Sequence, residues 1–362
     1  MDAAERQALR DWLSKRGASP DQLARAETEG QLGRLASELV LTTDARLSAR
    51  DLAKRAEAEP EDVAELFAAF GVAVPDLDAS QFTEADARLC TALCRPEGHG
   101  MDLGPLPHVI AASMDRIAEA AVALYVQGPQ ADILRSGADA VELAEKTATA
   151  TAAALDLGAG LGVLFRHHMR QAITRQRQAT EGIRRPELAR LAIGFVDLVG
   201  STSIEAALDV GELADMVSWF EARAFEVVAA GGGRLVKFIG DEIMVAAVDP
   251  LAGCRIIAAL VETFTVDALR PRAGLVYGEV LYRHGDYYGP VVNLAARLVD
   301  EAIPEEVLVD GSVVEAVGGG SPEAADSGLE RGPDAPAFEP AGRRLLKGFA
   351  EPVAVWSLRR GS

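Results

Sequence analysis

The pattern of apolar and polar positions changes near the middle of the chain. Residues 1–165 carry Ala, Leu, Glu, Asp and Arg at helical spacing with almost no β-branched runs, which predicts a bundle of short helices. From Leu191 onward, apolar strand-like runs alternate with helical segments in the order β-α-β-β-α-β. The fold class predicted is therefore α+β: an all-α N-terminal domain followed by a ferredoxin-like antiparallel sheet with helices on one face.

The expected elements of the second half follow from the same pattern. Strands are expected at 191–199, in a hairpin over 234–248, at 272–282, near Val307 and at 354–358; helices are expected from about 200 to 230, over 251–264 and over 291–299. The Gly-, Pro- and acid-rich segment 317–341 is expected to be a loop.

Residues 47–72 have the pattern of two helices joined by a turn. Ser48 is the expected N-cap, the break falls near Pro60 and the second helix ends at Gly71. A DNA-binding helix-turn-helix and a simple packed helix pair are both compatible with this pattern. The second helix carries three carboxylates and no cation, which disfavours contact with phosphates. Farther on, residues 111–126 are expected to form a core helix, with an apolar effector pocket between such helices as the alternative.

An arginine-rich segment separates the two halves. Residues 166–190 contain seven arginines and few acids, and their helical part is expected to end near Gly182. The predicted domains are a helical domain over 1–165, a linker helix over 166–189 and a second domain over 190–362. The linker is a helix that transmits signals between the domains, a basic strip that pairs with acidic surfaces elsewhere, or a solvated connection, and the sequence leaves these alternatives open.

Composition limits the class of protein. The 362-residue chain is 49% hydrophobic with a net charge of −19, which argues against binding nucleic acid or anionic membranes. Its most apolar stretch, 152–165, is short and interrupted by Asp156, so no membrane span is expected. The charged N-terminus does not resemble a signal peptide, and three cysteines form no even framework. A soluble, cytoplasmic protein is predicted.

Isolated cysteines and histidines receive no catalytic role. Cys90 and Cys94 are at helical spacing and are interpreted as core residues. His99, His108 and the pair His167–His168 could sense pH, although solvated or capping histidines are the simpler interpretation.

The candidate chemistry is concentrated in the hairpin over 234–248. Gly240 and Asp241 form its predicted tight turn, and Lys237 lies within an otherwise apolar, buried strand. Asp197 ends the preceding strand beside a helix N-terminus, where free N–H groups can hold phosphate. If the two strands are neighbours, Asp197 and Asp241 converge and suggest a two-metal site for phosphoryl transfer.

The segment GDYYGPVVNLAARL (285–298) adds a second group. It places Asp286 in a turn and puts Asn293 and Arg297 four residues apart on one helix face. Together with GFVDLVGST and VKFIGDE, this segment resembles the class III adenylate and guanylate cyclases over residues 190–360. Residues 1–189 resemble, more loosely, the regulatory modules of soluble actinobacterial members.

The resemblance implies specific roles at the metal and at the base. Asp197, Asp241 and the carbonyl of Leu198 match ligands of two divalent metal ions, Mg²⁺ or Mn²⁺. Lys237 and Asp286 match the purine-selecting pair, in which the lysine donates to adenine N1 and the aspartate accepts from the exocyclic amine. Guanine reverses this donor and acceptor pattern, so the pair favours ATP.

The remaining motif positions match residues around the ribose and the phosphates. Asn293 would orient the ribose, Arg297 would stabilise charge in the transition state, and Arg272 and Lys347 would bind phosphates. The resemblance implies an adenylate cyclase that acts as a homodimer and converts ATP to cyclic AMP and pyrophosphate. The N-terminal domain would regulate it in response to a small molecule or pH.

Two alternatives stay open at this point. One is a guanylate or relaxed-specificity cyclase. The other is a catalytically silent cyclase-like signalling module with a helix-turn-helix N-terminus.

Overall fold

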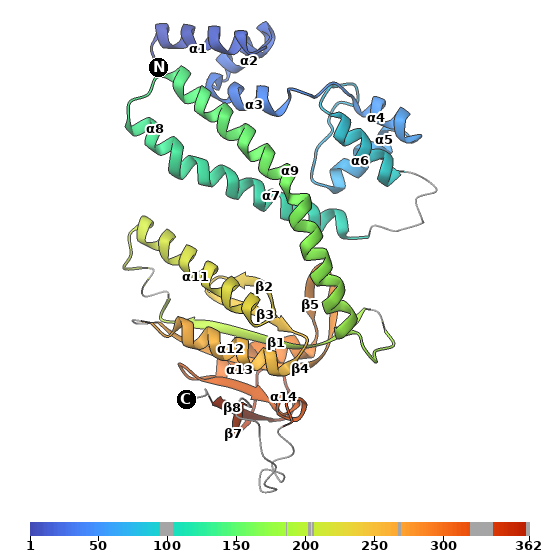
Figure 1. Cartoon of the computed structure of the whole chain (residues 1–362), viewed down its shortest axis with the longest axis vertical. Coiled ribbons are helices and arrows are strands. Elements are labelled where there is room, and N and C mark those ends of the chain that lie inside the picture. Colours follow the sequence, from blue (N-terminus) through green and yellow to red (C-terminus); the bar gives the residue numbers. More distant parts are fainter. Residues whose placement is uncertain are drawn as a thin grey trace. The chain divides into compact units, whose positions relative to one another are not determined.

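The computed structural model describes residues 1–94, 104–185, 187–201, 204, 206–266, 269–318 and 336–359. The chain divides into two compact units, a helical unit (Met1–His167) and a sheet unit (His168–Ser362) (Figure 1). His99, one of the candidate pH sensors, lies outside the described residues.

The first core of the helical unit joins the N-terminal helices to the start of a long helix. Its elements are α1 (Ala3–Lys15), α2 (Pro20–Thr28), a 3₁₀ turn η1 (Leu32–Arg34), α3 (Leu35–Leu41) and α9 (Ala140–Ala179). Leu9, Leu13 and Leu35 are buried there. Ala144 and Ala148, from the first turns of α9, belong to the same buried cluster. Their small side chains allow α9 to pack closely.

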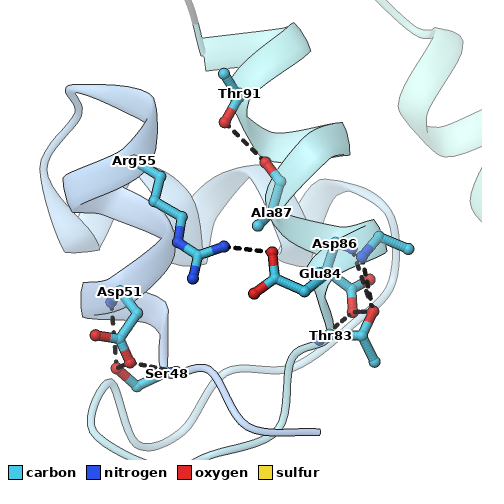
Figure 2. A network of polar contacts seen from close by, with 9 residues as sticks. Ser48, Asp51, Arg55, Thr83, Glu84, Asp86, Ala87 and Thr91 are labelled. Atoms are coloured by element: carbon cyan, nitrogen blue, oxygen red, sulfur yellow. Dashed lines mark hydrogen bonds and ion pairs between the residues drawn. The ribbon is translucent and has the colours of Figure 1, made fainter. Parts of the chain in front are cut away.

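The second core is formed by α4 (Ala49–Ala56), α5 (Pro60–Ala69) and α6 (Glu84–Cys94). Ser48 caps α4 in a reciprocal capping box with Asp51, and Pro60 opens α5. Both features confirm the predicted helix pair. Figure 2 shows that Arg55 of α4 reaches Glu84 at the start of α6, where the two side chains form an exposed ion pair of 2.5 Å. Cys90 and Cys94 lie in this cluster as expected, and burial raises the pKa of the Cys90 thiol to about 12.

Two long helices leave much of their apolar surface exposed. These are α7 (Leu106–Tyr125), which continues through a single π-helical turn, η2 (Val126–Gln130), into α8 (Ala131–Arg135), and α9. The prediction of a core helix over 111–126 is wrong in one respect: the helix forms, but it is mostly exposed. The large apolar residues exposed on α7 and α9 are Leu106, Ile110, Met114, Ile117, Val122, Leu124, Leu155, Leu157, Val163, Leu164, Phe165, Met169 and Ile173.

Helix α9 is also continuous through the predicted boundary at residue 165 and ends at Ala179, shortly before the left-handed Gly182. His167 and His168 lie on an exposed stretch within this helix, at the boundary between the two compact units. By length and composition α9 could cross a membrane, and only 6% of its most apolar window is buried. The absence of a membrane span consequently remains a prediction.

Among its described residues, the sheet unit contains one eight-stranded sheet in the order β2-β3-β1-β4-β6-β8-β7, with β5 paired to β4. The strands are β1 (Leu188–Val199), β2 (Arg234–Ile239), β3 (Glu242–Ala247), β4 (Arg270–Arg283), β5 (Asp286–Tyr288), β6 (Val307–Asp310), β7 (Ala337–Arg344) and β8 (Val353–Arg359). The helices are α11 (Val210–Ala230), α12 (Pro250–Phe264), α13 (Pro290–Glu301) and α14 (Gly311–Ala316). The antiparallel order β2-β3-β1-β4, with its two crossover helices, confirms the ferredoxin-like βαββαβ arrangement.

Alternating residues of the central strands belong to two hydrophobic cores, one on each face of the sheet. Val196 and Ile243 face α11 and α12, whereas Phe195 and Met244 face α13. Helices therefore cover both faces of the sheet, and not one as expected, because α13 follows the βαββαβ core and packs on the side that the crossover helices leave open. Gly274 of β4 makes this approach possible, since a Cβ there would lie 2.5 Å from the carbonyl oxygen of Ala295.

Three element boundaries differ from the sequence expectation. The helix expected from about 200 to 230 is interrupted: Ser201 and Ile204 are helical, residues 206–209 are not, and α11 begins at Val210, where Asp209 caps it. The expected loop over 317–341 contains the first residues of β7, and residues 319–335 lie outside the described part of the chain. Asp286 begins a short strand, β5, after the turn at His284 and Gly285.

Candidate active site

The two candidate metal aspartates lie at one end of neighbouring strands. Gly240 has φ +64° and forms with Asp241 the tight turn between β2 and β3, as predicted. Strands β1 and β3 pair directly, and Asp197 lies opposite Glu242, the residue after Asp241. The register therefore brings the two aspartates to the same edge of the sheet. The Ser201 hydroxyl is buried and hydrogen-bonded to the Asp241 carboxylate.

Arg272 is already in contact with this group. It lies opposite Asp197 in the β1–β4 register, and its Nε donates to Asp197 Oδ2 at 2.8 Å. Its Nη1 donates to the carbonyl oxygen of Asp300, at 3.0 Å. The candidate phosphate-binding guanidinium thus lies beside the candidate metal ligand.

The candidate purine-reading residues form an ion pair. Lys237 Nζ contacts Asp286 Oδ2, and Asp286 Oδ1 accepts from the Tyr287 backbone N–H at 2.8 Å. Lys237 was expected to be buried, but its side chain is 41% exposed, against 22% for Asp286. The lysine retains two further N–H donors, and the carboxylate retains free lone pairs.

Helix α13 carries the other two candidate residues on one face. Asn293 is exposed, and Arg297 Nη1 donates to Asp300 Oδ2 at 2.8 Å. Lys347 lies in an exposed turn after β7. Among the described contacts, no hydrogen bond or ion pair joins Lys347 to the other candidates.

Sequence reasoning missed two acidic neighbours of this group. Glu242 faces Asp197 across the β1–β3 pair, and burial, reinforced by the nearby Asp197, Asp300 and Asp241, raises the pKa of its carboxyl to about 7. Asp300 receives contacts from both Arg272 and Arg297. The spacing of three residues between Arg297 and Asp300 could have revealed the second, whereas the role of Glu242 depends on strand pairing.

The donor set fits a divalent cation. Asp197, Asp241 and the Leu198 carbonyl offer hard oxygen ligands, which Mg²⁺ and Mn²⁺ prefer. Within the described part of the chain, no cluster of three or more His, Cys, Asp or Glu side chains forms a complete cage. A metal held here would therefore share its remaining positions with substrate or water.

The chain is similar to several known proteins, adenylate cyclases among them. A model of the adenylate cyclase regulatory domain matches residues 1–176. An uncharacterized protein of Mycobacterium tuberculosis is 32% identical over 371 aligned residues, covering 98% of this chain and 90% of the relative. A pH-sensitive adenylate cyclase from the same species is 29% identical over 99% of this chain and 89% of its own length. An adenylate cyclase of Streptomyces coelicolor is 42% identical over 42% of this chain and 37% of its own.

The chain belongs to the class III adenylate cyclase family. It is a cyclase enzyme of the actinobacterial type, with a regulatory domain at its N-terminus. Among solved structures, the adenylyl cyclase CyaB of P. aeruginosa overlaps 48% of this chain and 96% of its own, with 20% identity and a TM-score of 0.41.

Proposed function

We propose that this cyclase converts ATP to 3′,5′-cyclic AMP and pyrophosphate. The observation that carries the proposal is the contact between Lys237 and Asp286, a donor and an acceptor from two different strands placed side by side. Adenine presents an acceptor at N1 and a donor at its amine, and this pair matches both. Guanine presents the reverse pattern, so it would face a donor with a donor.

The phosphate end of the substrate is assigned to the other group. Asp197, Asp241 and the Leu198 carbonyl would hold two divalent ions, Mg²⁺ or Mn²⁺, which when bound supply charge neutralisation and lower the pKa of the ribose 3′-hydroxyl. Arg272 donates a hydrogen bond to Asp197. Its guanidinium would therefore bind the phosphate oxygens of a nucleotide whose metal ions Asp197 holds. Lys347 is assigned to the leaving phosphates by family resemblance alone.

The reaction is an in-line displacement. The ribose 3′-oxygen attacks the α-phosphorus and its proton passes to water, while the bond to the bridging oxygen breaks and pyrophosphate leaves with the electron pair. Asn293 would orient the ribose and Arg297 would stabilise the charge that develops in the transition state. These residues mainly position the substrate and stabilise charge, and no side chain is assigned as a general base.

We further propose that the active form is a homodimer with sites at the interface. In the resembling family, one copy supplies the metal aspartates and the other supplies the purine pair with Asn293 and Arg297. This chain carries both sets, so two copies related by twofold symmetry form two equivalent sites. Exposed apolar residues on α11 and the hairpin, Trp219, Phe225 and Ile239, support an interface in the sheet unit.

The helical unit is proposed to regulate turnover through the arginine-rich segment 166–189. The match of residues 1–176 to a regulatory domain supports this role, and the pH-sensitive relative makes pH a candidate input beside a small molecule. A chain beginning at Arg184 is expected to differ in turnover from the full chain at one or more pH values. Equal turnover at every pH would overturn regulation by this unit.

A cytoplasmic location is proposed, without a membrane span or nucleic-acid partner. Cys90, Cys94 and Cys254 are all free, as expected in a reducing compartment. Helix α5 places Glu61 and Asp62 in its first turn, which opposes docking on phosphates.

The central test measures product. Purified full-length protein, shown to be dimeric by light scattering, is incubated with ATP or GTP and Mn²⁺ or Mg²⁺, and cyclic nucleotides are separated by chromatography. Cyclic AMP is expected, with little cyclic GMP. A dimer that makes neither product would identify a silent module, and equal use of both substrates would establish relaxed specificity.

A further inference from the structure

Arg234 forms hydrogen bonds with both sequence neighbours of Asp286, Gly285 and Tyr287. Its Nη1 donates to the Tyr287 hydroxyl at 3.0 Å, its Nη2 donates to the Gly285 carbonyl oxygen, and its guanidinium lies 5.3 Å from the centre of the Tyr287 ring. Arg234 belongs to β2, and Asp286 begins β5. These contacts therefore connect the strand that carries Lys237 to the turn that carries its partner.

A β-bulge makes this arrangement possible. The β2–β3 register shifts between Leu235 and Lys237, so that Arg234 lies opposite Ala246 and Lys237 lies opposite Met244. Ala246 and Met244 belong to the same core cluster. Arg234 and Lys237 consequently share one face, although residues three apart in a regular strand would point to opposite faces.

The segment that Arg234 contacts is short, and Tyr287 anchors it because this residue is buried in the core and its ring packs against Tyr282. Strand β5 is only three residues long and pairs with β4 alone, after a turn in which His284 and Gly285 both have positive φ. A short hairpin of this kind is marginally stable without further packing. The position of Asp286 therefore depends on the burial of Tyr287 and on the contacts of Arg234 with Tyr287 and Gly285.

We propose that Arg234 is a positioning residue for purine selection: it fixes Asp286 at the distance from Lys237 that matches the edge of adenine. The inference rests on the proposed ATP-cyclising function. A loosened Asp286 accepts less well from the adenine amine, and displacements near 1 Å can cost on the order of a hundredfold in rate. Loss of the Arg234 contacts therefore reduces the preference for ATP over GTP more than it reduces stability.

The experiment compares full-length variants in kcat/KM for ATP and GTP with Mn²⁺. Arg234→Met keeps much of the side-chain length without its donors, Arg234→Lys keeps the charge, and Tyr287→Phe removes one acceptor while keeping the ring. Arg190→Met is the matched control, because Arg190 makes a half-exposed 3.0 Å ion pair with Glu279 between β1 and β4 of the same sheet. Thermal melting is recorded for each variant.

Arg234→Met is expected to lower the ATP-to-GTP ratio of kcat/KM about tenfold or more, with a smaller loss in Tyr287→Phe and partial recovery in Arg234→Lys. Arg190→Met is expected to keep the wild-type ratio. An unchanged ratio in Arg234→Met, with both substrates reduced equally, would show that Arg234 only supports the fold. If that variant does not fold, an unchanged ratio in Tyr287→Phe overturns the inference.

A binding measurement separates this inference from the proposed function. Equilibrium binding of ATP and GTP with Ca²⁺ reports base preference without turnover. A wild type that prefers ATP in binding but makes no cyclic AMP overturns the proposed function, and the variants then test Arg234 through binding. A wild type that binds both nucleotides equally overturns the role of Arg234 itself.

Discussion

The two units of the chain differ in how completely they bury their apolar residues. The sheet unit encloses a core on each face of one sheet, with residues such as Ile243 and Leu275 on one side and Ile193 and Leu298 on the other. The helical unit has two smaller cores and leaves the apolar sides of α7 and α9 exposed. The site residues therefore lie on a scaffold with a closed core, whereas the long helices present a surface suited to further contacts.

The largest expected effect falls on the chemistry of the sheet unit. Arg297→Ala should lower kcat by about 30- to 1,000-fold, since the loss of one donor to a developing charge costs about 2–4 kcal/mol. Arg223→Ala is the control, because Arg223 forms an exposed ion pair with Glu226 on α11. Cyclic AMP production at saturating ATP measures the effect. A loss below threefold would remove Arg297 from the proposed transition-state role.

The exposed apolar surface of α9 provides the next test. Leu157 and Leu164 are seven residues apart, hence on one helix face, and both are exposed. Leu157→Glu with Leu164→Glu should weaken dimerisation of the full chain at least about tenfold, because each buried leucine contributes about 1.5–3 kcal/mol. Sedimentation measures the dimer.

The control adds the same charge at the same spacing without removing apolar area: Gln171→Glu with Gln178→Glu, both at exposed positions of α9. Unchanged association in the leucine variant would show that this surface does not join two copies. Flotation with phosphatidylcholine–phosphatidylglycerol vesicles tests the membrane alternative, and co-flotation of wild type would contradict the expected absence of a membrane span.

A serine–aspartate contact in each unit allows a closer comparison. Ser48 caps α4 and forms a hydrogen bond with Asp51 (Figure 2), whereas Ser201 forms one with Asp241 in the site. Ser48→Ala should lower the unfolding free energy of the helical unit by about 1 kcal/mol in urea, the usual cost of a lost N-cap, and leave turnover per dimer near wild type. Ser201→Ala should instead lower turnover. Reduced turnover in Ser48→Ala together with normal turnover in Ser201→Ala would contradict this comparison.

The smallest expected effect is a pH dependence within the sheet unit. Burial raises the pKa of Asp310, the N-cap of α14, against opposing hydrogen bonds from Ser312 and Val313. A raised pKa in the folded state means that the protonated form stabilises the fold below the ordinary aspartate range near 4, and that this contribution is lost as pH rises through the raised value.

Asp310→Asn keeps a capping oxygen and removes this titration. Its unfolding free energy relative to wild type should therefore increase from pH 4 to pH 8, as measured by urea midpoints. A constant difference across that range would indicate that Asp310 titrates at its ordinary pKa.

The sequence was sufficient wherever the pattern is local. Capping at Ser48, the proline that opens α5 and the Gly240–Asp241 turn were all predicted correctly, because each depends on a few adjacent backbone groups. The interruption before α11 was not, since an apolar helical pattern does not specify where a new cap divides it, and Asp209 provides that cap.

The sequence by itself determined the family motifs and hence the candidate residues of the site. The tertiary structure decided which of them meet: strand pairing places Arg272 on Asp197, and a bulge in β2 turns Arg234 toward the neighbours of Asp286. It also decided that α7 and α9 stay exposed in the single chain. The sequence pattern of an apolar helix face is the same whether its own domain or another surface covers that face. The reason is that the hydrophobic effect depends on the area removed from water and not on which chain removes it.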